Sequence, residues 1–385
     1  MKATGRCTLA LLVFIFLTPL AFGEEEVGSA AERLILSGIL QAGFSYHIGN
    51  QILLDPEQTD GEDGGRVAAA RGDLAEFYLS RARFSLAGRH LGGNLGFLAR
   101  WDLVPEPEIV DLWAEMSYIP YTVLRLGRFA PELSFFGPRE VSDLFLIDPP
   151  LMDANPWGES LLGFRRTGLS AHVRAPFLEA QFGILNGGTD GGFGDENTAK
   201  DFFLNVTYKY YDVLKVKGAY YYGLALNEGE SEIDPDGNFR ELNDASQTFV
   251  AGVWFHRDLG ILLVAEAAYR ILTTAEEASE DIKSLSCYGM AGFNLRMLTR
   301  VPLEFVVRYD YFDPDLDNDA GGTGQNDELT AITGGVNLEI LRRRAMVYLN
   351  YIHRIEAWKD VQAPDGGTQT GIEDDEIKLQ VQVSF

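Results

Sequence analysis

The side chains best suited to chemistry in this chain are arginines and carboxylates that flank or lie within one long apolar segment. Guanidinium groups bind anions, and arginines that oppose carboxylates across a narrow opening create a transverse field, which orients dipolar solutes and sorts ions by sign. The alternative is that the arginines only pair with nearby acids such as Asp111 and Glu115. The candidate residues are Arg81, Arg83, Arg100, Arg125, Arg128, Arg139, Arg166, Glu132, Glu140 and Asp143.

Patterns for catalysis or metal binding are weaker. Ser170 and His172 lie two residues apart on one face of a predicted strand, which does not by itself make a nucleophile and its base. The 5 histidines are scattered over different strands, so we expect neither a metal site nor a cofactor. The acidic run 313–319 departs from a calcium-binding loop because Ala320 stands where the turn needs glycine. We interpret this run as a solvated acidic loop.

The first residues have the pattern of a secretory leader. Lys2 and Arg6 precede an apolar run at 9–17, and small residues occupy the positions that a signal peptidase reads at Ala21 and Gly23. We therefore expect residues 1–23 to be a signal peptide and residues 24–385 to form one mature domain.

The mature composition restricts the function further. Loss of the 2 basic residues of the leader leaves 30 of the 32 basic side chains against 57 acidic ones, which argues against nucleic acid as a partner. Cys287 is the only remaining cysteine, so an internal disulfide is excluded. Beyond the leader no run of apolar residues is long enough for a transmembrane helix.

The carboxyl-terminal stretch 376–385 predicts the architecture. Its apolar residues alternate without a break with polar ones, and the chain ends on Phe385. A strand of this kind faces lipid on one side and water on the other in an outer-membrane barrel. It resembles the terminal signal that the outer-membrane barrel assembly machinery recognises. An ordinary sheet strand that happens to be last is the alternative.

Strand patterns recur along the whole chain and give an even count of sixteen, which a closed antiparallel barrel requires. The predicted strands are 34–47, 76–88, 94–103, 109–118, 123–129, 166–174, 177–185, 201–210, 213–224, 247–256, 261–271, 284–298, 301–312, 329–341, 344–354 and 376–385. Every second connection is tight and those between are mostly long, as in barrels with short periplasmic turns and long external loops. Aromatic residues near the tight turns, such as Tyr118, Tyr121 and Tyr210, suggest an interfacial girdle.

The longest connection, 129–165, is expected to fold into the barrel. It is rich in Phe and Leu and contains Trp157, and a loop that apolar is not left in solvent. Packing on the rim or on a neighbouring subunit is the alternative. Arginine is costly on the lipid face, by roughly 2–4 kcal/mol at mid-bilayer, so we expect Arg81, Arg83, Arg100, Arg125 and Arg166 to face the water inside. The strand 76–88 is irregular, because Arg81 and Arg83 share their parity with Phe77 and Leu79.

Four stretches resemble one known family. SRARFSLAG at 80–88, LRLGRFAPELSFFG at 124–137, FRRTGLSAHV at 164–173 and FGILNGG at 182–188 are similar to the phosphate-selective porins O and P. The resemblance covers much of the front half, and it implies a trimeric sixteen-stranded porin whose third loop enters the pore. Ala130 stands where members of that family carry a lysine.

The sequence therefore predicts an all-β, 16-stranded antiparallel transmembrane β-barrel with a long pore-constricting third loop, in the outer membrane of a Gram-negative bacterium. We expect no enzyme activity but passive diffusion of small charged solutes, with anions such as phosphate as candidates. The expected partners are solutes in transit, outer-membrane lipid and lipopolysaccharide, the assembly machinery and two further copies in a homotrimer. The alternatives are a non-conducting structural or adhesive barrel and an outer-membrane lipid hydrolase. An energised transporter is disfavoured because no plug precedes the first strand.

Overall fold

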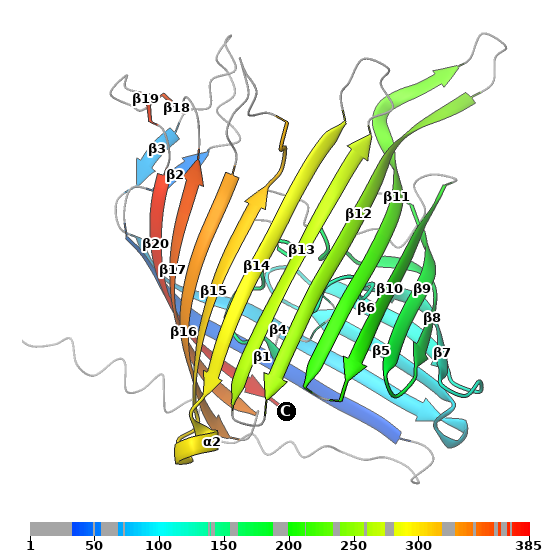
Figure 1. Cartoon of the computed structure of the whole chain (residues 1–385), viewed down its shortest axis with the longest axis horizontal. Coiled ribbons are helices and arrows are strands. Elements are labelled where there is room, and N and C mark those ends of the chain that lie inside the picture. The colour runs from blue at the N-terminus through cyan, green and yellow to red at the C-terminus, as the bar shows by residue number, and fades with distance from the viewer. Residues whose placement is uncertain are drawn as a thin grey trace, which may run out of the picture.

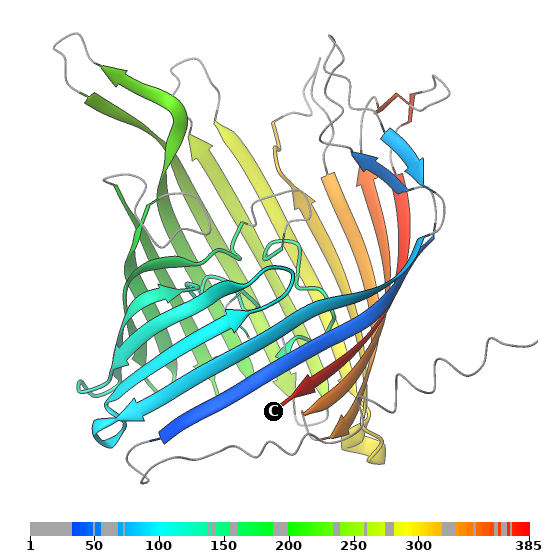
Figure 2. The same ribbon diagram turned by 180° about the vertical axis from the view of Figure 1, so that it is seen from behind.

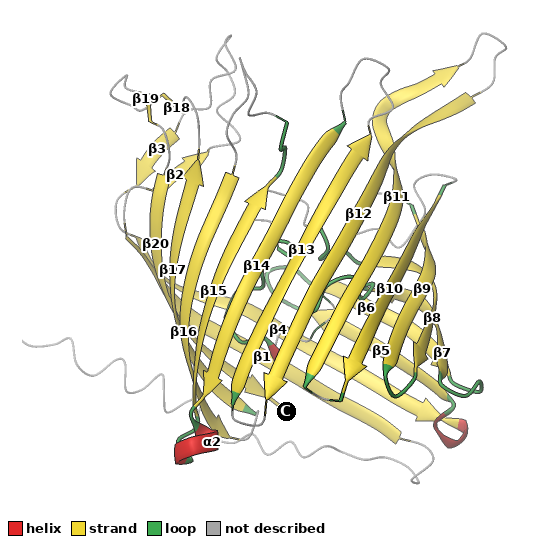
Figure 3. Ribbon diagram, in the orientation of Figure 1, coloured by secondary structure: helices red, strands yellow, loops and turns green. Residues whose placement is uncertain are grey.

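The computed structural model forms a closed antiparallel barrel of sixteen strands, in which each strand pairs with its sequence neighbours and β1 pairs with β20 (Figures 1 and 3). The predicted fold is confirmed. The structure describes residues 33–48, 51–54, 68–71, 74–137, 139, 143–154, 161–187, 199–211, 213–233, 239–257, 260–273, 281–317, 328–341, 344–357, 361–362, 368–369 and 372–385. The predicted signal peptide, residues 1–23, lies outside these ranges.

The barrel strands are β1 (Arg33–Ile48), β4 (Leu74–His90), β5 (Leu95–Asp102), β6 (Glu108–Met116), β7 (Thr122–Phe129), β8 (Arg166–Arg174), β9 (Leu178–Asn186), β10 (Lys200–Tyr210), β11 (Leu214–Ile233), β12 (Phe239–Arg257), β13 (Ile261–Thr273), β14 (Ile282–Asn294), β15 (Leu303–Asp313), β16 (Glu328–Leu341), β17 (Ala345–Ala357) and β20 (Ile372–Ser384). Strands β5 to β9 are the shortest strands of the barrel, at 8 or 9 residues each. Two small hairpins, β2 (Gln51–Leu54) with β3 (Ala68–Arg71) and β18 (Val361–Gln362) with β19 (Thr368–Gln369), lie in long connections. Both hairpins lie beyond the same end of the barrel (Figure 2).

Alternation of side chains gives the barrel an apolar outside. In β10, Phe202, Leu204 and Val206 are exposed, whereas Phe203 and Asn205 between them are buried. The same period of two runs through β13 and β20, because successive residues of a strand point to opposite faces. The exposed tyrosines at the tight turns include Tyr118, Tyr121, Tyr208, Tyr210 and Tyr211, as the predicted girdle requires. Among the described residues, no helix is long and apolar enough to cross a membrane.

A β-bulge in β4 explains the strand that looked irregular in the sequence. Gln41 of β1 is paired with Arg81, and the next residue, Ala42, is paired with Leu79, so that Ser80 is extra. An extra residue reverses the alternation at that point. Phe77 and Leu79 therefore face outward before the bulge, while Arg83 behind it is 4% exposed and faces inward.

Several element boundaries differ from the prediction. The strand predicted at 284–298 ends at Asn294, and the short helix α2 (Arg296–Thr299) follows it. Arg300 closes that helix with a left-handed φ of 66°. Another helical turn, η1 (Leu91–Gly93), forms the tight link between β4 and β5. Strands β11 and β12 extend beyond the predicted 213–224 and 247–256, and they project past their neighbours (Figure 1).

Candidate functional site: a passage beside the inward-folded loop

The connection between β7 and β8 enters the barrel and is bound there mainly through its main chain. We refer to its described residues, 130–137, 139, 143–154 and 161–165, as the inner loop. Wall side chains from opposite sides of the barrel reach its backbone. Figure 2 shows the chain after β7 running through the interior of the barrel.

At the entry of the inner loop, two wall side chains of opposite charge bind the main chain of three residues within 132–135. The Lys217 ammonium of β11 donates to the carbonyls of Glu132 and Ser134, at 3.1 and 2.6 Å. The Glu266 carboxylate of β13 accepts from the Phe135 amide at 2.8 and 2.9 Å. Because Tyr288 also donates its hydroxyl to Glu266, at 2.6 Å, the buried carboxylate is satisfied from two directions.

The far part of the inner loop is bound in the same way by strands near the end of the chain. Arg308 of β15 donates to the carbonyls of Asp148 and Pro149 at 2.8 and 3.0 Å. Asn337 of β16 donates to the Phe145 carbonyl at 2.7 Å, and Asn350 of β17 accepts from the Ile147 amide at 2.8 Å. These contacts fix the path of the loop across the lumen.

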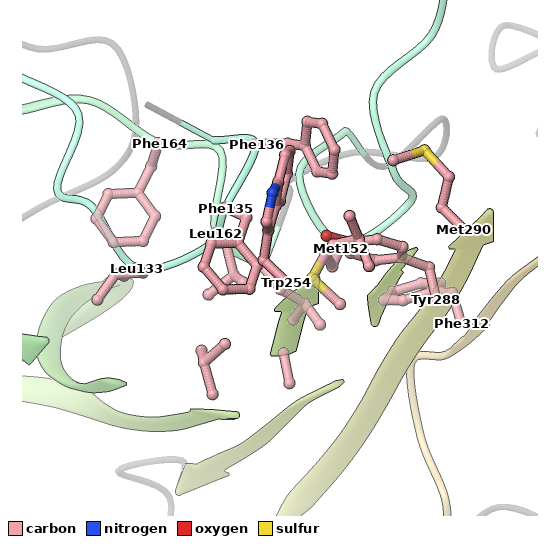
Figure 4. Close-up of a cluster of buried hydrophobic side chains, with 14 of the residues drawn as sticks. Leu133, Phe135, Phe136, Met152, Leu162, Phe164, Trp254, Tyr288, Met290 and Phe312 are labelled. Carbon is pink, nitrogen blue, oxygen red and sulfur yellow. The ribbon is translucent and has the colours of Figure 1, made fainter. Parts of the chain in front are cut away.

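A buried apolar cluster fills the space between the inner loop and strands β10 to β16. Trp254 of β12 is central, with its ring centroid 5.6 Å from that of Phe135 and 5.8 Å from that of Phe136. Figure 4 shows loop side chains facing Trp254 and Tyr288 of the wall. Each large side chain buried in this way contributes about 1.5–3 kcal/mol. The loop members are Leu133, Phe135, Phe136, Leu146, Met152, Leu161, Leu162 and Phe164, and Phe129 at the end of β7 packs with them.

One carboxylate of the inner loop sits against this cluster with half of its hydrogen-bonding capacity unused. Asp153 Oδ1 accepts from the Ser134 hydroxyl at 2.6 Å, and Ser134 Oγ accepts from the Gly137 amide at 2.7 Å. Asp153 Oδ2 has no hydrogen-bond partner among the described residues. Burial, with a smaller contribution from the nearby Glu266 carboxylate, raises the pKa of Asp153 to about 7.

The open part of the lumen lies on the other side of the inner loop. A cavity of about 710 Å³ is enclosed by the loop and by strands β1, β4, β17 and β20. Basic side chains outnumber acidic ones in its lining. The basic residues are Arg81, Arg83, Arg139, Arg165, Arg354 and Lys378, and the acidic residues are Glu76, Asp148, Asp153 and Glu376.

Three of the predicted arginines line this cavity. Arg83 forms a bidentate pair with Asp102, at 2.8 Å from Nε and 2.6 Å from Nη2, and Arg81 Nε lies 3.6 Å from the same carboxylate. Arg139 belongs to the inner loop and lies over the Trp254 ring, with Cζ 4.2 Å from the ring centroid.

The other predicted arginines face the interior but do not border the cavity. Arg100 pairs with Asp111, and Arg125 Nη2 lies 3.5 Å from Glu115 while its guanidinium stacks on Trp113. These two acids are the ones named in the alternative interpretation of the sequence, in which the arginines pair with nearby acids. Arg128 pairs with Glu108 and Arg166 with Asp201, at 3.3 and 3.5 Å.

The predicted acids are dispersed. Glu132 Oε1 lies 3.6 Å from His172 Nδ1, away from the cavity, and Asp143 is exposed. Glu140 lies outside the described residues. The serine and histidine of β8 are both buried, with Ser170 Oγ 3.2 Å from His172 Nε2 and the Gln181 amide 2.7 Å from the same nitrogen. A pair enclosed in this way has no route to a substrate.

Sequence reasoning missed a charged network on the cavity wall opposite Arg139. Lys378 of β20 lies 2.8 Å from Asp148 and 3.3 Å from Glu376, and Arg354 of β17 lies 2.8 Å from Glu376. His47 of β1 lies 3.4 Å from Glu376. The signal was present, because Lys378 alternates with outward Ile377 and Leu379, but nothing in the sequence indicated which inward residues meet the loop.

Known proteins resemble this chain in structure rather than in sequence. No family model and no curated protein sequence matches it. An anion-selective porin of Comamonas acidovorans has a TM-score of 0.65 at 16% identity, over 92% of this chain and 100% of that one. The outer-membrane channel DcaP of Acinetobacter baumannii has a TM-score of 0.64 at 10% identity, over 93% of this chain and 99% of that one. OmpF of Salmonella typhi, solved with daunomycin, has a TM-score of 0.54 at 13% identity, over 94% of this chain and 100% of that one.

The chain has the porin fold. Its apolar exterior and closed sheet place it in the outer membrane of a Gram-negative bacterium. The narrower resemblance to phosphate-selective porins O and P is not tested by these similarities and stays a prediction.

Proposed function

We propose that this barrel is a porin through which small charged solutes diffuse passively, with anions preferred. The observation that carries the proposal is the cavity of about 710 Å³ beside the inner loop, in whose lining basic side chains outnumber acidic ones. Arginine side chains on such a lining attract anions and repel cations. The similarity to a porin described as anion-selective supports the same sign. No catalytic step is part of this function.

Within this proposal the predicted residues have two roles. Arg81, Arg83 and Arg139 meet the solute directly. Arg100, Arg125, Arg128 and Arg166, with Glu132, Glu140 and Asp143, shape the field from the wall and the loop. Phosphate is one candidate solute.

The remaining features of the proposal concern assembly. We infer that residues 1–23 are removed and that residues 24–385 form the mature barrel, which assembles as a homotrimer among lipid and lipopolysaccharide. The terminal strand ending at Phe385 serves as the signal for the barrel assembly machinery. This inference is supported by the alternation of the strand and its position at the seam of the barrel.

A non-conducting barrel is the second candidate, and the apolar cluster between the inner loop and β10–β16 favours it. Conductance separates the two functions. In a planar bilayer, we expect stepwise ionic currents. In a chloride gradient, the reversal potential should have the sign of an anion-selective pore. If phosphate binds in the pore, added phosphate should reduce the chloride current. The triple variant Arg81→Gln, Arg100→Gln, Arg125→Gln should lose anion preference. An unchanged selectivity would remove the proposed role of the arginines, and an absence of current would support the closed barrel.

A further inference from the structure

The cavity has two chemically different sides. Strands β4, β17 and β20 contribute charged groups, most of which are already neutralised within the wall. The inner loop contributes the apolar side chains Phe136, Leu144, Ile147 and Pro149, together with the charged residues Arg139, Asp148, Asp153 and Arg165. A solute in this space therefore meets charged groups on the strand side, and apolar side chains next to charged ones on the loop side.

Arg139 differs from the other cations that line the cavity. Arg83 is paired with Asp102, Arg165 with Asp111, Arg354 with Glu376 and Lys378 with Asp148. No ion pair of Arg139 occurs among the residues that the structure describes. Its Nε donates to the Phe135 carbonyl at 2.7 Å. Within the part of the chain that the structure describes, its two terminal amino groups make no hydrogen bond, and they can donate to another acceptor.

The surroundings of Arg139 orient it and supply an apolar contact. Its Cζ lies 4.2 Å from the centroid of Trp254 and 5.4 Å from that of Phe136. Stacking on rings restrains a guanidinium without neutralising it. An anion bound to Arg139 would consequently lie beside Phe136. Leu144 and Ile147 of the same loop also line this cavity.

We propose that this passage selects organic monoanions with an apolar body, namely aromatic or branched aliphatic carboxylates, and that Arg139 binds the carboxylate while Phe136, Leu144 and Ile147 receive the body. The inference rests on the proposed function and names its class of solute. Phosphate gains nothing from the apolar side chains of the loop, because its oxygens are strongly hydrated on all faces. A carboxylate with a ring loses apolar surface to the loop, which is favourable in proportion to the area buried.

The test uses the intact protein in planar bilayers with chloride as the carrier of current. Benzoate, acetate and inorganic phosphate are added in turn, and the concentration that halves the chloride current is measured. We expect benzoate to act at about a tenfold lower concentration than either acetate or phosphate, a ratio of the size that one well-buried apolar contact provides. Acetate is the control for the carboxylate without the body.

Two variants separate the head from the body. Arg139→Gln should weaken the effect of benzoate and acetate alike. Ile147→Thr keeps the β-branch but shortens the side chain and adds a hydroxyl, so it should weaken the effect of benzoate severalfold and leave that of acetate unchanged. Arg296→Gln, a cation of α2 outside the cavity, is the matched control and should change neither. Migration of the unheated protein on a gel verifies that each variant is folded.

The possible outcomes distinguish a failure of this inference from a failure of the proposed porin function. Without any chloride current, the porin proposal fails and takes this inference with it. With a normal chloride current, phosphate acting at the same or lower concentration than benzoate overturns the inference alone. Folded Arg139→Gln and Ile147→Thr proteins that respond to benzoate as the unaltered protein does overturn it as well.

Discussion

Phe385 and Gly38 exchange both of their main-chain hydrogen bonds, each 3.0 Å long, across the seam where the last strand meets the first. The Phe385 ring lies over Gly38 in the space that a Cβ atom would need: such an atom would be 2.4 Å from Cζ of the ring. The terminal aromatic group is thus fitted to a glycine on the strand that closes the barrel.

Substitution of that glycine should weaken closure. Gly38→Val forces the Phe385 ring away from its site, and overpacking of this kind costs about 1–3 kcal/mol. We expect the folded form to convert to the unfolded form at a lower temperature, as followed by gel migration after stepwise heating. Gly218→Val is the control, because a Cβ at Gly218 meets nothing within 4 Å. Equal stability of the two variants would contradict the role of this contact.

The entry of the inner loop should depend on Lys217. Lys217→Met leaves the carbonyls of Glu132 and Ser134 without their donor, at a cost of about 1–3 kcal/mol for each buried group. The freed loop should fluctuate, so single-channel currents should become larger or noisier. Lys209→Met removes an ammonium that pairs with Glu179 beside a tight turn, and its currents should match those of the unaltered protein. Identical traces for both variants would mean that Lys217 does not hold the loop.

The attachment of the inner loop should weaken as pH rises through neutrality. The pKa of Asp153 is about 7 in the folded protein and about 3.9 in an unfolded chain, so folding favours the protonated acid. Its stabilising effect is complete below pH of about 4 and is lost as the pH passes about 7, by at most about 4 kcal/mol.

The measurement is the thermal transition at pH 5 and at pH 8.5. The unaltered protein should melt at a lower temperature at the higher pH, and Asp153→Asn, which stays neutral while accepting from Ser134, should reduce that difference. A difference of the same size in Asp153→Asn would assign the pH dependence to other groups.

Selectivity should respond to the acid that neutralises the arginines of β4. Asp102 binds both Arg83 and Arg81, so Asp102→Asn increases the positive charge beside the cavity by one. The reversal potential in a salt gradient should move toward that of chloride. Glu179→Gln removes an equal charge near a tight turn and should move it much less. A shift of the same size in both would show that total charge, rather than position, sets the selectivity.

The sequence was most informative where structure depends on local alternation. Strand number, the lipid-facing side and the polar side of β20 follow from a period of two that water and lipid impose on each strand separately. The bulge at Ser80 could not be placed, because an unpaired residue is defined by the neighbouring strand and not by its own sequence. The irregular parity of Arg81 and Phe77 was its only sign.

The site was predicted less completely for a related reason. That the apolar connection would enter the barrel followed from its composition, since such a segment must find cover. Which wall it would cover did not follow, because the side chain of Trp254 lies more than a hundred residues along the chain from Phe135. The arginines of the front strands were identified as inward-facing, but the open space lies where β4 and β1 meet β20 and β17, so Lys378 and Arg354 border it instead of Arg125 and Arg166.

The way in which the wall holds the inner loop has a consequence for how such a protein can diversify. The wall side chains hydrogen-bond to main-chain amide and carbonyl groups, which almost every amino acid possesses. These side chains are Lys217, Glu266, Asn337 and Arg308. The side chains of Ile147 and Leu144 take no part in these hydrogen bonds, so they can be exchanged while the path of the loop is retained. The lining of the cavity can therefore change in evolution through a few substitutions, while the barrel and the path of the loop stay the same.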